Sequence, residues 1–185
     1  YYALQFMSGA RRQIFVVFAG FLMVEKFEFT VAEISMLLIA NAAINVVFAP
    51  KIGRLIQRFG ERKSLIFEYI GLSLIFAGYA FVESSHFAVF LYIADHLFFS
   101  IAIALKTYFQ KIADPADIAS SSGVSFTINH IAAVFIPVAF GLVWLSSPSL
   151  VFLAGSGMAI VSLILALNMP SKPAFGNEVL LGKFS

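Results

Sequence analysis

Ionisable residues inside long apolar stretches are the first chemical feature of this sequence. Arg11 and Arg12 stand side by side in one such stretch, and Asp95 is followed by His96 in another. Arginine offers a fixed positive charge and directional N–H donors that suit an anion, whereas His, and Asp removed from water, can exchange protons near neutral pH. A charge at mid-membrane depth costs at least about 2.5–3.5 kcal/mol, so we expect these residues to face the protein interior or a water-filled cavity.

Uncharged polar residues accompany these charges in two further apolar stretches. Asn41 and Asn45 lie four residues apart and therefore share one face of a helix. A second group of polar residues runs from 127 to 130. The predicted substrate contacts are Arg11, Arg12, Asn41, Asn45, Thr127 and Asn129, and the predicted proton-coupling or ion-pair residues are Asp95, His96 and His130.

The Asp95–His96 pair has three open interpretations. It can form a static ion pair with Arg11 or Arg12, act as a proton site coupled to transport, or belong to a catalytic group. A metal site is disfavoured, because no third ligand at a metal-binding spacing accompanies His96 and His130. We therefore expect neither a metal nor another cofactor.

The composition indicates that these residues belong to an integral membrane protein. The chain has 185 residues, of which 61% are hydrophobic and 12% charged, and its mean hydropathy is +0.94. An ordinary soluble domain is roughly 45–50% apolar and about 25% charged. The net charge of +2 gives no electrostatic basis for binding nucleic acid, and the absence of cysteine excludes disulfides and thiolate chemistry from this sequence.

Six apolar segments are long enough to cross a bilayer as helices, at about 20 residues each. They are expected at 1–24, 30–49, 64–82, 87–109, 122–144 and 149–168, followed by a flexible tail at 171–185. In the first segment, the apolar run after Arg12 spans only about 16 Å, whereas the membrane core is about 30 Å thick. The helix must therefore begin near residue 1, and this places both arginines near mid-depth.

The basic residues outside these segments are distributed unequally between the two sides. One side has only Lys26. The other side collects Lys51, Arg54, Arg58, Arg62, Lys63, Lys111, Lys172 and Lys183. The positive-inside rule places the second side, with the C-terminus, in the cytoplasm of a multi-pass protein of the cytoplasmic or plasma membrane.

The distribution of polar residues also separates the spans from one another. The third span carries only Glu68, near its inner end, where we expect it to meet the basic loop. The sixth span carries no ionisable residue. We therefore expect the first, second, fourth and fifth spans to line a cavity.

The predicted loop from Lys51 to Lys63 carries a recognisable pattern. Residues 53–63 are Gly-Arg-Leu-Ile-Gln-Arg-Phe-Gly-Glu-Arg-Lys. This resembles the cytoplasmic loop signature of the major facilitator superfamily, Gly-x-x-x-Asp-Arg-x-Gly-Arg-Arg. The residues in register are Gly53, Arg58, Gly60 and Arg62, whereas Gln57 replaces the Asp and Glu61 the first of the paired arginines. The glycines allow a tight turn, and the arginines can bond the carbonyl groups at a helix C-terminus.

The resemblance covers essentially residues 1–170 and implies a fold and a function. It implies a secondary transporter of two six-helix halves that bind substrate between them at mid-membrane. This all-α chain would be the C-terminal half. Its partners would be the lipid bilayer, a small-molecule substrate, protons in the case of proton-coupled transport, and the N-terminal six-helix half of the same polypeptide. The hypothesis is proton-coupled or facilitative transport of a small polar or anionic solute by alternating access.

Two other functions stay open at this point. One is an intramembrane enzyme that uses Asp95, His96 and His130, which requires the three side chains to converge within hydrogen-bond reach. The other is a six-span accessory membrane subunit that is complete as it stands.

Overall fold

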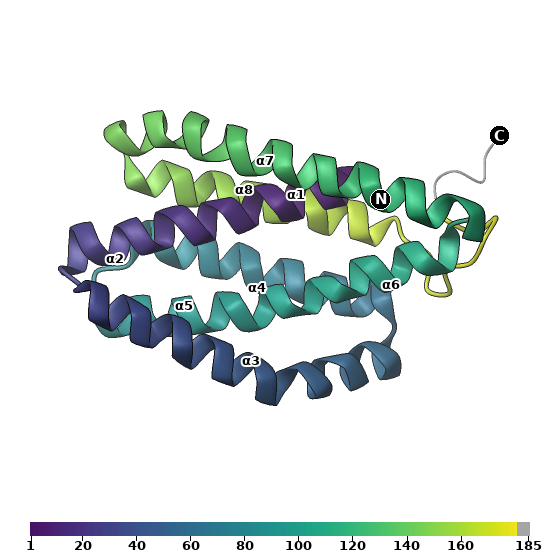
Figure 1. The fold of residues 1–185 in the computed structure, drawn as a ribbon, viewed down its shortest axis with the longest axis horizontal. Helices are drawn as coiled ribbons and strands as arrows, with labels where there is room; N and C mark the ends of the chain where they lie inside the picture. Colours follow the sequence, from purple (N-terminus) through teal and green to yellow (C-terminus); the bar gives the residue numbers. More distant parts are fainter. Residues whose placement is uncertain (181–185) are drawn as a thin grey trace.

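The computed structural model describes residues 1–180 of the chain. Within that range, six helical stretches are long and apolar enough to cross a membrane, which confirms the predicted all-α membrane class. Figure 1 shows them as an elongated bundle in which the N-terminus and the segment that follows α8 lie at the same end. The basic residues of the connections gather at that end, and Lys26 lies near the opposite one.

Two of the six spans contain a break in regular α-helix. The first consists of α1 (Tyr2–Gln13), the π-helical segment η1 (Ile14–Ala19) and α2 (Gly20–Phe27). The fourth consists of α5 (Ser85–Phe99), the 3-10 turn η2 (Ser100–Ala102) and α6 (Ile103–Ile112). The first span is helical from residue 2 onward, as the short apolar run after Arg12 requires.

The other four spans are uninterrupted helices. They are α3 (Val31–Phe59), α4 (Glu61–Phe81), α7 (Ile118–Ser146), which follows the 3-10 turn η3 (Pro115–Asp117), and α8 (Pro148–Leu167). Thr30 begins α3 with a capping box, because its hydroxyl accepts from the Glu33 amide while the Glu33 carboxylate accepts from Thr30.

The predicted loop from Lys51 to Lys63 is wrong. The helix α3 continues through Pro50 to Phe59, and Gly60 alone separates it from α4. Hydropathy reports where a chain leaves the apolar core, whereas residues 51–59 are mostly good helix formers that extend the helix beyond it. The chain reverses at Gly60 because its φ of +83° lies in a region that residues with a Cβ rarely adopt.

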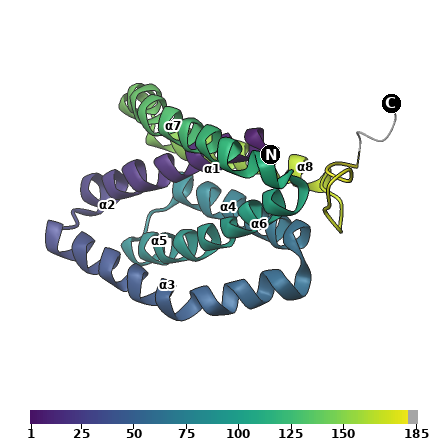
Figure 2. The ribbon, with the colours of Figure 1, turned by 45° about the vertical axis from the view of Figure 1, so that its right-hand side comes forward.

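Helix packing is uneven across the bundle. The most extensive helix contacts join α4 to α8 and α1 to α7. Gly155 lets α8 approach the Phe76 ring of α4, and Gly9 lets α1 approach Asn129 of α7. By contrast, α3 lies at one edge of the bundle, beside α5 (Figure 2), and most of its residues are exposed.

The tail was expected to be flexible, and its described part is instead bound to the helix ends. The Arg62 guanidinium donates to the Leu167 carbonyl at 2.9 Å and to the Ser171 hydroxyl at 3.3 Å. The Tyr108 hydroxyl donates to the Glu178 carbonyl. Side chains of two other helices, Arg62 of α4 and Tyr108 of α6, hold the tail, and composition does not reveal such long-range contacts. The rest of the predicted tail, 181–185 with Lys183, lies outside the described residues.

Candidate functional site

The polar residues near the middle of the bundle fall into two groups. We call Arg11, Glu68 and Asp95 the buried cluster, because each is at most 1% exposed. We call Arg12, Asn45, His96 and Ser100 the open cluster, because Arg12 is exposed and the other three are half-buried. The two clusters use consecutive residues of the same helices: Arg11 and Arg12 on α1, and Asp95 and His96 on α5.

The Arg11 side chain is held between three helices. Its Nη1 atom donates to the Ser162 hydroxyl at 2.5 Å and to the Met158 carbonyl at 3.2 Å, both on α8. Its guanidinium also lies 4.8 Å from the centre of the Tyr69 ring on α4, a cation–π distance. Nε and Nη2 are buried and make no hydrogen bond to the part of the chain that the structure describes. Arg11 is therefore fixed on one side and unpaired on the other.

The two carboxyl groups of the buried cluster come from different helices. Glu68 lies on α4 and Asp95 on α5, and the oxygens of both are buried without a hydrogen bond to any described residue. The charge of Arg11 acts on both carboxyls, and the two carboxyls act on each other. Neither lies within 4.0 Å of the guanidinium, since among residues 1–180 the ion pair at that distance is Lys111 with Glu61.

The expectation that Glu68 meets a basic loop is wrong. Because α4 begins at Glu61 rather than at residue 64, Glu68 lies two turns into the helix, about 10 Å from its start. One signal in the sequence points to this position: Arg11 at mid-depth needs a partner, and Glu68 is the acid of the third span.

The open cluster joins α1, α3 and α5. The Arg12 guanidinium lies 5.6 Å from the centre of the Phe99 ring, and its charge acts on His96. The Ser100 hydroxyl donates to Asn45 Oδ1 at 3.2 Å. Arg12 is exposed and, like Arg11, makes no ion pair within 4.0 Å with any residue in the described range. The arrangement presents a positive charge and an imidazole on one accessible face.

Adjacent residues on a helix point about 100° apart, and this geometry separates each sequence pair. Arg11 and Asp95 point inward, whereas Arg12 and His96 reach the open side. Two irregular segments lie close by: η1 starts two residues after Arg12, and η2 starts at Ser100. Such departures from α-helix frequently occur at functional positions and hinges.

The remaining predicted contacts are not joined to either cluster by a hydrogen bond. Thr127 and His130 are exposed on α7 and bond carbonyls of their own helix, those of Gly123 and Phe126. Asn129 is half-buried and packs against Gly9 of α1. Asn41 is buried on α3, and its side-chain atoms make no hydrogen bond to a described residue.

The geometry that the enzyme hypothesis requires is not formed. Asp95 is buried, His96 is half-buried beside Arg12, and His130 is exposed with its Nδ1 bonded to Phe126 of the same helix. No hydrogen bond joins any two of these three within residues 1–180. Over the same range, no three His, Asp or Glu side chains are grouped so that they could hold a metal ion.

The sequence model of the Major Facilitator Superfamily matches residues 1–180. The chain belongs to this superfamily. Its members are membrane transporters rather than enzymes, so the chain is an integral, multi-pass protein of a transport family. No curated protein and no solved structure is significantly similar to it.

The superfamily loop pattern now has a structural explanation. Gly60 makes the reversal between α3 and α4, and Arg62 bonds a carbonyl at the end of α8, as expected for a motif arginine. Gly53 lies inside α3, and the exposed Arg58 lies over the Phe59 ring. Glu61 replaces an arginine of the pattern and pairs with Lys111 of α6 at 2.5 Å. The altered motif therefore still ties three helix ends together.

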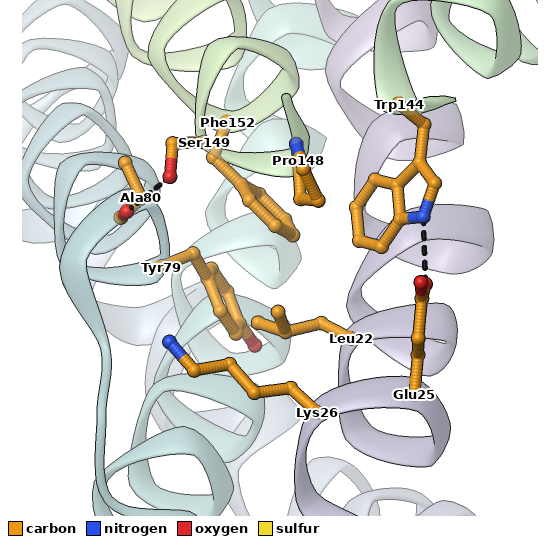
Figure 3. Close-up of a pocket in the computed structure, with 9 residues that line it drawn as sticks. All are labelled: Leu22, Glu25, Lys26, Tyr79, Ala80, Trp144, Pro148, Ser149 and Phe152. Carbon is orange, nitrogen blue, oxygen red and sulfur yellow. Dashed lines mark hydrogen bonds between the residues drawn. The ribbon is translucent and has the colours of Figure 1, made fainter. Parts of the chain in front are cut away.

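A separate pocket of about 390 Å³ lies near the opposite end of the bundle (Figure 3). Its polar side chains brace helices: the Trp144 indole donates to Glu25 at 2.8 Å, Lys26 donates to the Val82 carbonyl at 2.7 Å, and Ser149 donates to the Ala80 carbonyl. It shares no lining residue with either cluster. We regard it as a helix-end contact of the fold.

Proposed function

We propose that this superfamily member moves a small anionic or polar solute across the membrane by alternating access, and that the chain forms the C-terminal six-helix half of the transporter. Arg12 carries the proposal. It is an exposed guanidinium ten residues into a 26-residue span, about 15 Å from the start of the helix. A charge at that depth needs water or an anion to offset its cost.

The buried cluster strengthens the assignment of an anion. Asp95 interacts with Arg11 rather than with Arg12, so the positive charge on the open side is not neutralised by that carboxylate. We propose that a solute anion binds Arg12, with Asn45 of the open cluster and the α7 residues Thr127 and Asn129 as further hydrogen-bonding groups. Arg11 and Asn41 are buried, and they would reach the solute only after the helices move.

The exposed side chains of α3 and α7 support the proposal of a half. The side chains on α3 and α7 are largely exposed, and α7 carries Thr127 and His130 on its exposed surface. A solute site built on an open face needs a second wall to exclude water and to alternate access. We propose that the N-terminal half supplies it. Facilitative transport is the alternative if no ion is coupled.

Uptake of labelled anions by whole cells tests this function. In the full-length transporter, Arg12→Gln is expected to lower uptake of a transported mono- or dicarboxylate about 10- to 100-fold, the effect of losing one charge-assisted hydrogen bond of about 1.5–3 kcal/mol. Arg12→Lys keeps the charge and is expected to retain more activity than the Gln variant.

Two controls accompany this assay, and one outcome would overturn the assignment. Arg54→Gln, at the exposed inner end of α3, is expected to leave uptake near the wild-type level. Residues 1–185 expressed alone are expected to show background uptake. Unchanged uptake in both Arg11→Gln and Arg12→Gln would rule out a substrate role for these residues.

Orientation is measurable because the chain has no native cysteine. In intact cells, an impermeant maleimide is expected to label Ser84→Cys, between α4 and α5, but not Ser120→Cys, at the start of α7. Labelling of Ser120→Cys is expected only after lysis, because the positive-inside rule places its end of the bundle in the cytoplasm. The reverse pattern would overturn the proposed cytoplasmic C-terminus.

A further inference from the structure

We propose that Arg11, Glu68 and Asp95 form a proton-binding site that holds one exchangeable proton on its two carboxyl groups. The inference deepens the proposed function and rests on it for the coupling role, because proton binding at this site would be the step that is coupled to solute transport. Glu68, which lies outside the residues first predicted for proton coupling, is an essential member.

The charges of the buried cluster do not balance without a bound proton. One guanidinium and two carboxyls are enclosed at 0–1% exposure, so the cluster has a net charge of −1 when both carboxyls are ionised. An uncompensated charge in a low-dielectric interior costs several kcal/mol. One bound proton makes the cluster neutral, with one carboxylate left to balance Arg11.

Most hydrogen-bonding groups of the buried cluster are unpaired. All four carboxyl oxygens of Glu68 and Asp95, and two of the three guanidinium nitrogens of Arg11, are buried without a hydrogen bond to a described residue. The third nitrogen, Nη1, is tied to Ser162 and Met158 of α8. The cation is therefore stationary, while both carboxyls keep free acceptor sites on which a proton can bind and leave.

The other groups around the carboxyls do not supply a second charge. Tyr69 and Tyr79 of α4 and Tyr92 of α5 interact electrostatically with them, and all three are phenols. The side chain that α8 brings to this region, Ser162, carries no charge. Within residues 1–180, Arg11 is thus the cation that the two carboxyls share.

The buried cluster is connected to the open cluster through α1 and α5. Asp95 precedes His96 in the chain, and the charge of Arg12 acts on His96. Arg11 likewise precedes Arg12. When the proton leaves, the two carboxylates are drawn toward the fixed Arg11, and Asp95 carries α5 with it. The 3-10 turn η2, four residues after His96, is where α5 can move relative to α6. Loss of the proton from the buried cluster would therefore change the position of His96 in the open cluster.

Infrared difference spectroscopy tests the site with the proton as the probe. Spectra of the purified full-length protein are recorded between acidic and alkaline buffer, and the carbonyl stretch of protonated carboxylic acids is followed. The wild type is expected to show one pH-dependent buried carboxyl. Glu68→Gln and Asp95→Asn are each expected to lose this band, since the remaining carboxylate is balanced by Arg11. Glu33→Gln, at an exposed position on α3, is expected to keep it.

Variants of Arg11 test how many protons the two carboxyl groups bind. Arg11→Gln is expected to increase the band to about twice its size, because both carboxyls then need a proton. Arg11→Lys is expected to keep the wild-type amplitude. If the band is unchanged in both Glu68→Gln and Asp95→Asn, or if Na⁺ rather than the proton removes it, the proposal is wrong. The spectra involve no solute, so this result is independent of the uptake assay for the proposed function.

Discussion

Arg11→Met is expected to lower the free energy of unfolding by about 3–5 kcal/mol, the cost of removing one partner from a buried charge cluster. Glu68 and Asp95 would then lie in a closed interior without a cation. Met has a similar length and fills the space between Tyr69 and Ser162, so the effect isolates the charge from the packing. Thermal unfolding of the purified protein in detergent, followed by tryptophan fluorescence of Trp144, measures it.

Two further variants separate this cause from general damage to the helix. The triple variant Arg11→Met, Glu68→Gln, Asp95→Asn contains no charge in the cluster and is expected to regain most of the lost stability. Arg12→Met, on the exposed side of the same helix, is expected to unfold near the wild-type temperature. Equal unfolding temperatures for Arg11→Met and Arg12→Met would contradict the buried electrostatic role.

Gly155→Leu is expected to cost about 3 kcal/mol of stability, at the upper end of the usual penalty for overpacking. A Cβ at Gly155 would lie 2.9 Å from Cδ1 of Phe76, whose side chain is 1% exposed and has no room to move. The clash lies in the contact between α4 and α8, the most extensive in the bundle. The two helices would have to separate, and α8 would take the anchor of Arg11 with it.

The same helix offers a matched control. At Gly157 a Cβ meets no atom within 4 Å, so Gly157→Leu makes the same chemical change without the clash. It is expected to leave the unfolding temperature and the yield of folded protein close to those of the wild type. A similar loss in both variants would show that helix composition, rather than the approach of α8 to Phe76, sets the effect.

Some of the site was predictable from the sequence because its cause is local. An arginine pair that leaves too few apolar residues for a span must lie at mid-depth, whatever its neighbours are. The same one-dimensional argument predicts six spans, and the loop pattern around Gly60 predicts the superfamily. The separation of Arg11 from Arg12 follows from the 100° between adjacent residues, although the sequence does not say which of them points inward.

The rest depends on contacts between segments far apart in the chain. The sequence places Glu68 near the inner end of its span, because its depth is counted from the edge of an apolar run. The helix in fact begins three residues earlier, at Glu61. The predictions for the end of α3 and for the tail are wrong for a related reason. Hydropathy measures the partition of residues into lipid. It includes neither helix propensity, which extends α3, nor contacts with other helices, which hold the tail. Long-range partners such as Ser162 leave no signal in a single sequence.

The amino-acid sequence by itself determined that this is a six-span membrane protein with charges at mid-depth, because the cost of placing each residue in lipid is a property of that residue. The tertiary structure alone decided which charges share an interior. Burial joins Arg11, Glu68 and Asp95 from three helices, and it leaves Arg12 and His96 on an open face. The balance of charge within the enclosed group, which one proton makes neutral, exists only once the helices have packed.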